Sequence, residues 1–389
     1  MLRCRPGTAA NAAGETIPDQ RCTTPLRYVL HRIRETSRIC ATALAAALAL
    51  AHPAAAQQKP PPKPHAAPPV QYAPQTALPP PTSAGQTPDL AFGAFQRGQF
   101  LTAFQYATER VEQKDDPIAM TLLGELYANG LGVPQNDNKA ADWYRLAAAR
   151  GDRNAMFALA MFALQGRAGP RDREQSAKWL AAAAKLGHPQ AAYDLALLYI
   201  EGQLFPQDFK RAAELLRTAA DAGSPQAQYA LGTFYKDGRG VGKDLHEAVT
   251  LWGQAALGDD TDAEVEYAIA LYNGDGVARN EDEAAAIFRK AAEHGSAIAQ
   301  DRYARILASG LGAPRDPVKA VKWHLISRAG GETDITLDDF MAKLDAATVA
   351  EGTKQAQPWL DALKQAQAAR TQAATTPGPA PPSPAAPAK

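Results

Sequence analysis

Small and apolar residues recur through the middle of the chain with the spacing of one helix face. Ala227, Leu231 and Tyr235 stand four residues apart, so they lie on one side of a predicted α-helix. A second helix is predicted between Asp244, whose carboxylate can cap free N–H groups, and Gly258. The pattern therefore predicts a pair of helices joined by a short loop.

This helix pair repeats six times with a period of 36 residues. A glycine, which adopts the left-handed conformation at little cost, ends each first helix. These structural glycines are Gly130, Gly166, Gly202, Gly238, Gly274 and Gly310. An Asn or Asp precedes each second helix as its expected cap: Asn136, Asp172, Asp208, Asp244, Asn280 and Asp316. Neither helix can bury its apolar face alone, so the copies must stack into an α-solenoid.

The repeats set the expected domain boundaries. Residues 89–116 read as a degenerate first copy, so the solenoid is expected to span 89–331. Polar capping helices are predicted over 332–370, with Pro358 starting the last of them. The Ala- and Pro-rich tail at 371–389 buries too little apolar surface to fold.

The repeat resembles the Sel1-like repeat, a relative of the tetratricopeptide repeat. The first copy carries the matching residues Ala119, Leu123, Gly124, Tyr127, Gly130, Gly132, Val133, Ala140, Trp143, Tyr144, Ala147, Ala148 and Gly151. The resemblance implies an all-α, right-handed superhelix whose members typically act as adaptors. Exported bacterial members are associated with signalling, envelope assembly and host interaction.

Several copies depart from the family pattern. The second copy has Ala163 at its tyrosine position and Ala168 in its loop, and the third has Leu204 where a glycine is usual. The cysteine-rich subset of the family joins each helix pair by a disulfide, and this repeat region contains no cysteine. The properties of that subset therefore do not transfer to this chain.

The N-terminal region has the organisation of a secretory signal. An arginine-rich stretch precedes the apolar run 39–51, and small residues lead up to an expected cleavage after Ala56. The run is shorter than the roughly 20 residues that span a bilayer. We expect a signal peptide at 1–56 and a periplasmic location. An uncleaved anchor that keeps residues 39–51 is the alternative.

The segment 57–88 contains eleven prolines, which favour an extended, polyproline-like spacer. A proline-rich ligand is the alternative interpretation. The three cysteines, Cys4, Cys22 and Cys40, all precede the expected cleavage site. The expected mature chain therefore has neither disulfides nor cysteine-based catalysis or zinc sites.

Composition and motifs do not point to chemistry. The net charge is zero and no long basic run occurs, so nucleic acid is not an expected partner. His188, His246, His294 and His324 lack metal-ligand spacing and are interpreted as surface or second-helix positions. The acidic cluster 259–262 lacks the distal glutamate of a calcium loop and suits a helix cap. We expect no enzyme activity, no metal and no cofactor.

Partner binding is then the expected role, through the first helices on the concave face. Phe157, Tyr193 and Tyr229 share one repeat position, and Asp194 and Gln228 flank the two tyrosines. Aromatic anchors of this kind dominate binding hot spots. Ordinary packing between copies is the alternative for these rings.

The favoured hypothesis is a protein–protein adaptor or regulator in the cell envelope. A protein that binds or hydrolyses cell-wall fragments or β-lactams is the alternative from another class, and peptidoglycan fragments would be its partners. It requires a nucleophile that the repeats do not reveal. A membrane-tethered scaffold is the third possibility.

Overall fold

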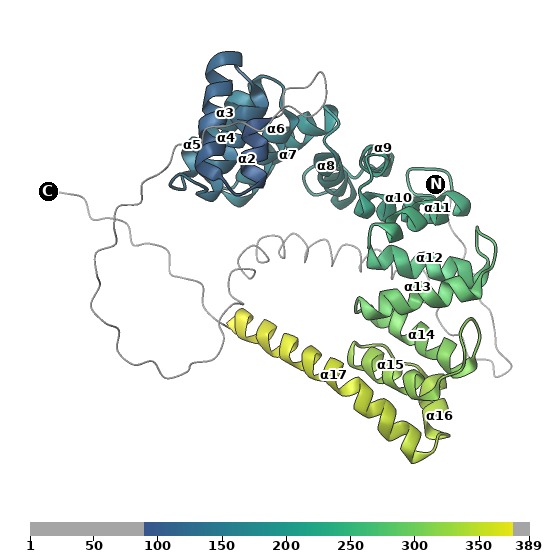
Figure 1. Cartoon of the computed structure of the whole chain (residues 1–389). Coiled ribbons are helices and arrows are strands. Elements are labelled where there is room, and N and C mark those ends of the chain that lie inside the picture. Colours follow the sequence, from purple (N-terminus) through teal and green to yellow (C-terminus); the bar gives the residue numbers. More distant parts are fainter. Residues whose placement is uncertain (1–88, 376–389) are drawn as a thin grey trace, which may run out of the picture. The chain divides into compact units, whose positions relative to one another are not determined.

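The computed structural model describes residues 89–375, and within this range all regular structure is helical (Figure 1). The helices are α2 (Leu90–Gln96), α3 (Phe100–Lys114), α4 (Pro117–Asn129), α5 (Asp137–Ala149), α6 (Arg153–Gln165), α7 (Arg173–Lys185), α8 (Pro189–Glu201), α9 (Phe209–Asp221), α10 (Pro225–Asp237), α11 (Leu245–Leu257), α12 (Thr261–Asn273), α13 (Glu281–Glu293), α14 (Ala297–Ser309), α15 (Pro317–Ala329), α16 (Ile335–Ala342) and α17 (Ala346–Thr375). The expected signal, the proline-rich linker, the three cysteines and residues 376–389 lie outside the described part. None of the described helices is long and apolar enough to cross a membrane.

The helices begin and end where the repeated residues stand. Each of the six Asn or Asp side chains precedes a second helix and accepts a hydrogen bond from the backbone N–H three residues on. Each of the six glycines follows a first helix with a positive φ, from 65° at Gly130 to 84° at Gly310. The helix pairs α4–α5 through α14–α15 therefore follow the 36-residue period.

A second glycine in the loop lets consecutive copies approach closely. A Cβ atom added at Gly240 would lie 2.1 Å from the carbonyl oxygen of Phe209, the first residue of α9 in the preceding copy. Gly276 and Gly312 meet the starts of α11 and α13 in the same way. In the second copy Ala168 holds this position with a φ of 56°, a strained conformation for a residue with a Cβ.

The core forms between helices that follow one another in the chain. First helices turn a small residue toward a large one on the second helix: a Cβ at Gly232 would lie 2.6 Å from the indole nitrogen of Trp252. Gly124 meets Tyr144 in the same manner. Alanines at the repeated position 119 and its equivalents are buried throughout. The stack is therefore an α-solenoid held by close contacts of small with large side chains.

The C-terminal end differs from the prediction in one respect. Pro358 does not start a helix; it lies inside α17, which begins at Ala346 and continues past the expected boundary to Thr375. Pro358 and Lys354, the residue whose carbonyl would receive the missing N–H, are both exposed, so water can take the lost bond. α17 packs along α15, where Gly352 allows close approach to Val321 (Figure 1).

Candidate protein-interaction face

The outward side of four consecutive first helices, α4, α6, α8 and α10, carries a row of half-buried side chains. Two positions four residues apart contribute from each helix: Thr121, Glu125, Phe157, Met161, Tyr193, Leu197, Tyr229 and Thr233. We call this row the first-helix face. Its residues alternate with the buried positions that pack on the second helices, so it is the side that stays partly open.

The three aromatic side chains combine packing with partial exposure. The ring of Phe157 stacks on His188, the residue that caps α8, with centroids 4.5 Å apart. Tyr229 packs against the buried cluster around Trp252. Phe157 and Tyr229 therefore contribute to packing, while all three rings remain partly accessible.

The two tyrosines lie in an acidic environment. Burial, and then the charges of Asp194 and Asp260, raise the pKa of Tyr193 to about 12. Burial raises the pKa of Tyr229 as well, and the charges of Asp262 and Glu266 raise it further. Asp260 caps α12 by accepting from the N–H of Ala263. The middle of the face thus combines aromatic rings with negative charge.

Asp194 and Gln228 have different roles, although both flank the tyrosines. Burial raises the pKa of Asp194 to about 6, and the only hydrogen bond to its carboxylate within residues 89–375 comes from Gln190, at 2.8 Å. Gln228 is 8% exposed, and its amide donates to the carbonyl of Ala220. We therefore assign Gln228 to packing between copies and keep Asp194 on the accessible face.

Asp194→Asn is expected to stabilise the protein at neutral pH. The folded carboxyl has a higher pKa than the usual value near 3.9, so it destabilises the fold increasingly as pH rises from about 4 to 6. We expect a gain of about 1–2 kcal/mol in unfolding free energy at pH 8 and no gain at pH 3.5. Urea unfolding across this range measures it, with exposed Asp339→Asn as the control. An equal gain at both pH values would contradict the assignment.

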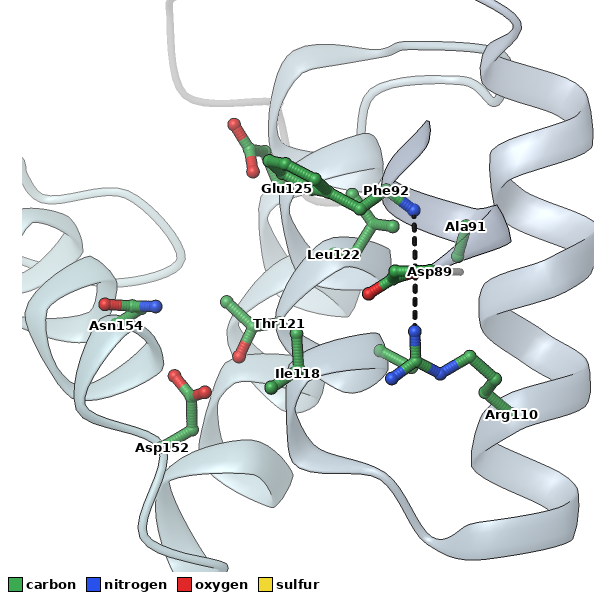
Figure 2. A pocket seen from close by; sticks show the side chains of 11 residues that line it. Asp89, Ala91, Phe92, Arg110, Ile118, Thr121, Leu122, Glu125, Asp152 and Asn154 are labelled. Atoms are coloured by element: carbon green, nitrogen blue, oxygen red, sulfur yellow. Dashed lines mark hydrogen bonds and ion pairs between the residues drawn. The ribbon is translucent and has the colours of Figure 1, made fainter. Parts of the chain in front are cut away.

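The first-helix face begins at a shallow cavity of about 260 Å³ near α2 (Figure 2). Ile118 and Phe92 at its rim are 57% and 47% exposed, which is high for large apolar side chains. Burial raises the pKa of Glu125, which has no side-chain hydrogen bond or ion pair among the described residues. This end thus repeats the combination of apolar surface with a carboxylate that lacks a cation.

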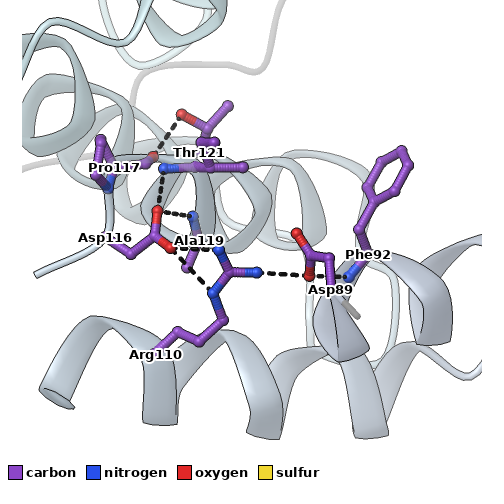
Figure 3. Close-up of polar contacts among 8 residues, drawn as sticks. Asp89, Phe92, Arg110, Asp116, Pro117, Ala119 and Thr121 are labelled. Carbon is purple, nitrogen blue, oxygen red and sulfur yellow. Dashed lines mark hydrogen bonds and ion pairs between the residues drawn. The ribbon is translucent and has the colours of Figure 1, made fainter. Parts of the chain in front are cut away.

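Two acids at this cavity, Asp89 in its wall and Asp116 beside it, already have a cation partner. Arg110 on α3 bridges Asp89 and Asp116, the residues that cap α2 and α4 (Figure 3). Burial opposes ionisation of Asp89, but the hydrogen bond and charge of Arg110 give it a lowered pKa. The bridge joins α2 and α3 to the first 36-residue repeat, and so it is a structural feature.

Other polar clusters also hold helices together. Glu264 is 1% exposed and pairs with Lys290 at 2.9 Å and His294 at 3.3 Å. The buried imidazole of His324 contacts Asp338 of α16 at 2.8 Å. Within residues 89–375 no group of three or more His, Cys, Asp or Glu side chains is placed to hold a metal ion.

The sequence pattern missed part of the face. Met161 and Leu197 lie one helical turn after Phe157 and Tyr193, so the period identifies them once the aromatic position is known. Glu125 occupies the same position in the first copy. That Glu125 and Asp194 have no cation partner among the described residues could be recognised only from the three-dimensional structure.

The fold defines a helical-repeat protein of the α-solenoid class. The Sel1 repeat model matches six consecutive segments, 117–152, 153–188, 189–224, 225–260, 261–296 and 297–331, which cover more than half of the chain. The chain belongs to the Sel1 repeat family. Sel1 repeats are typically protein–protein interaction modules.

Solved structures of the same kind resemble the chain. A Sel1 repeat protein from Oxalobacter formigenes is 26% identical with a TM-score of 0.51, over 64% of this chain and 99% of that one. A protective antigen of uropathogenic Escherichia coli strains with an SLR fold is 24% identical with a TM-score of 0.51, over 75% and 72%. A comparison with curated proteins finds no match.

Proposed function

We propose that the protein is a non-enzymatic adaptor of the cell envelope that binds a protein segment along its first-helix face. The observation that carries the proposal is the first-helix face, a row of half-buried side chains that includes Glu125 and lies beside the half-buried Asp194. Burial disfavours the charge of both carboxylates, and neither forms an ion pair within residues 89–375.

The chemistry of the face suggests the chemistry of the partner. A segment with apolar side chains would cover Met161, Leu197 and the edges of the tyrosine rings, which removes apolar surface from water. A lysine or arginine in that segment would meet Asp194 or Glu125 and favour the ionised carboxylate. We therefore propose an apolar and basic segment as the ligand.

The location in the envelope rests on the N-terminal sequence alone. The basic stretch, the apolar run 39–51 and the small residues before Gln57 support export and cleavage after Ala56. N-terminal sequencing of the protein from its native cells tests this part separately. A chain that starts at Gln57 supports it, and a chain that retains residues 39–51 contradicts cleavage.

Site-specific photo-crosslinking tests the face. We expect a photoreactive residue at Met161 or Leu197 of the full chain to capture the same protein in native cells. The control is Ala181, an exposed position on the second helix α7. The face is the wrong one if Ala181 captures that protein equally well, or if neither first-helix position captures any protein.

The same crosslinking experiment with charge-removing variants tests whether the partner segment is basic. Asp194→Asn combined with Glu125→Gln should reduce the crosslinking yield severalfold, because both substitutions remove an acceptor for a cation. Asp339→Asn serves as the exposed control. An unchanged yield in the double variant would rule out the basic character of the segment while leaving the face itself supported.

A further inference from the structure

A separate cavity of about 320 Å³ opens in the second repeat, between α5, α6 and α7. Its walls come from the second helix of one copy, the first helix of the next, and the loop 167–170. The residues that matter here are Arg145, Phe162, Ala163, Gln175 and Trp179. None of them belongs to the first-helix face, so the cavity stands apart from the proposed function.

The cavity lies where three of the other five copies place a tyrosine and the remaining two place a leucine, Leu271 and Leu307. The tyrosines equivalent to Ala163 are Tyr127, Tyr199 and Tyr235. The main chain is held alike in each: the carbonyl of Ala163 accepts from Asp172 at 2.9 Å, and that of Tyr235 accepts from Asp244 at 3.0 Å. Ala163 therefore presents its Cβ as Tyr235 does, and the space of a phenol ring remains open.

The fourth repeat shows what surrounds such a ring. The guanidinium of Arg217 lies over the ring of Tyr235, with its carbon 5.2 Å from the centroid, and donates to the phenol oxygen. The same guanidinium pairs with Glu247 at 2.9 Å. One side chain thus holds both the face and the hydroxyl of the tyrosine.

The surroundings of Ala163 keep the equivalents of both polar residues, one from the first repeat and one from the second. Arg145 stands at the position of Arg217, and Gln175 stands at the position of Glu247, 72 residues earlier in each case. Both line the cavity. Arg145 now pairs with Asp142 at 2.7 Å in an exposed contact of little energy, so its guanidinium is available.

We propose that this cavity is a recognition pocket for a tyrosine side chain presented by another protein. The phenol ring would lie against Phe162 and Trp179, where Arg167 already stacks on Phe162 with 4.4 Å to its ring centroid. The hydroxyl would accept from Arg145 and donate to Gln175. The pocket is then a place where a partner supplies the residue that the repeat lacks.

Binding of p-cresol, which is the tyrosine side chain itself, tests the pocket directly. We expect saturable binding to the full chain, followed by NMR at the indole N–H of Trp179 and assigned with Trp179→Phe. Toluene, which lacks the hydroxyl, should bind roughly fivefold to tenfold more weakly. Arg145→Ala should reduce p-cresol affinity to that of toluene and leave toluene unchanged. Equal affinity for both compounds, or no saturable binding, would overturn the proposal.

A variant that fills the cavity gives the second arm. Ala163→Tyr should fold with at least the original thermal midpoint and lose p-cresol binding, because its own phenol occupies the space. Leu164→Tyr, on the neighbouring exposed position, should keep it. A lowered midpoint for Ala163→Tyr, or p-cresol binding that survives it, would contradict the tyrosine shape of the cavity.

A peptide arm distinguishes a protein side chain from a free phenol. The tripeptide acetyl-Ala-Tyr-Ala-amide should shift the same indole resonance, and acetyl-Ala-Phe-Ala-amide should do so severalfold more weakly. Binding of p-cresol without binding of the tyrosine tripeptide would overturn recognition of a protein partner.

Discussion

Replacing Gly240 with alanine lowers the free energy of unfolding by an expected 3 kcal/mol or more. The new Cβ would lie 2.1 Å from the carbonyl oxygen of Phe209 and 2.7 Å from the amide nitrogen of Lys210. Both atoms belong to the backbone at the start of α9, so no rotamer change relieves the overlap. The φ of 67° adds about 1–2 kcal/mol, because alanine resists the left-handed region.

Substitutions at two other glycines separate the cost of the steric overlap from the cost of the left-handed backbone. Gly223 has a φ of 85° and open space around it, so Gly223→Ala measures the conformational cost alone. Gly242 has open space and no left-handed φ, so Gly242→Ala should change stability by roughly 0.5 kcal/mol or less. Urea unfolding followed by circular dichroism ranks the three variants. Gly240→Ala no more destabilising than Gly223→Ala would show that the close approach between copies is not a constraint.

Replacing Lys290 with methionine is expected to cost about 2–3 kcal/mol. The substitution leaves the buried carboxylate of Glu264 with His294 as its remaining ion-pair partner. Removing one member of a buried pair is strongly destabilising, since an uncompensated charge stays behind. The half-exposed position of Lys290 and the remaining histidine reduce the loss.

The repeat itself provides the rescue. At the position of Glu264, the neighbouring copies have Gln228 and Gln300, whose amides donate to the carbonyls of Ala220 and Ala292. Glu264→Gln should therefore donate to the equivalent carbonyl of Ala256, which Lys290 now approaches at 3.5 Å.

In the Glu264→Gln background, Lys290→Met should cost roughly 0.5 kcal/mol or less. Lys319→Met, which removes an exposed pair with Asp316, is the control with a similarly small expected effect. Thermal unfolding of the four variants gives the coupling energy. Equal losses from Lys290→Met with and without Glu264→Gln would refute a specific role for the buried pair.

Much of the fold follows from local signals that the 36-residue period makes visible. Gly238 and Asp244 act through their own backbone torsion and nearest N–H groups, so the sequence predicts their roles without tertiary knowledge. Pro358 misled the prediction because proline is common at helix starts. The small residues Gly352 and Ala356 allow α17 to pack closely on α15, and they indicated a helix that already begins before Pro358.

The candidate site could be predicted less completely from the sequence. The repeat position of Tyr193 and Tyr229 indicated a face, but the packing role of Gln228 depends on the carbonyl end of α9 beside it. The sequence showed that Ala163 lacks an aromatic ring. It did not show that the surrounding helices leave the space open, because packing could equally have closed it.

The sequential packing of the helices also determines how the solenoid responds to force. The extensive helix contacts in the repeats join elements that follow one another in the chain, such as α9 with α10 and α10 with α11. Tension between the ends of the repeats at 117–331 therefore loads these interfaces in series, because no extensive contact within these repeats joins helices far apart in the chain. We therefore expect the repeats to extend by the successive separation of neighbouring helices at low force, in the manner of a compliant spring.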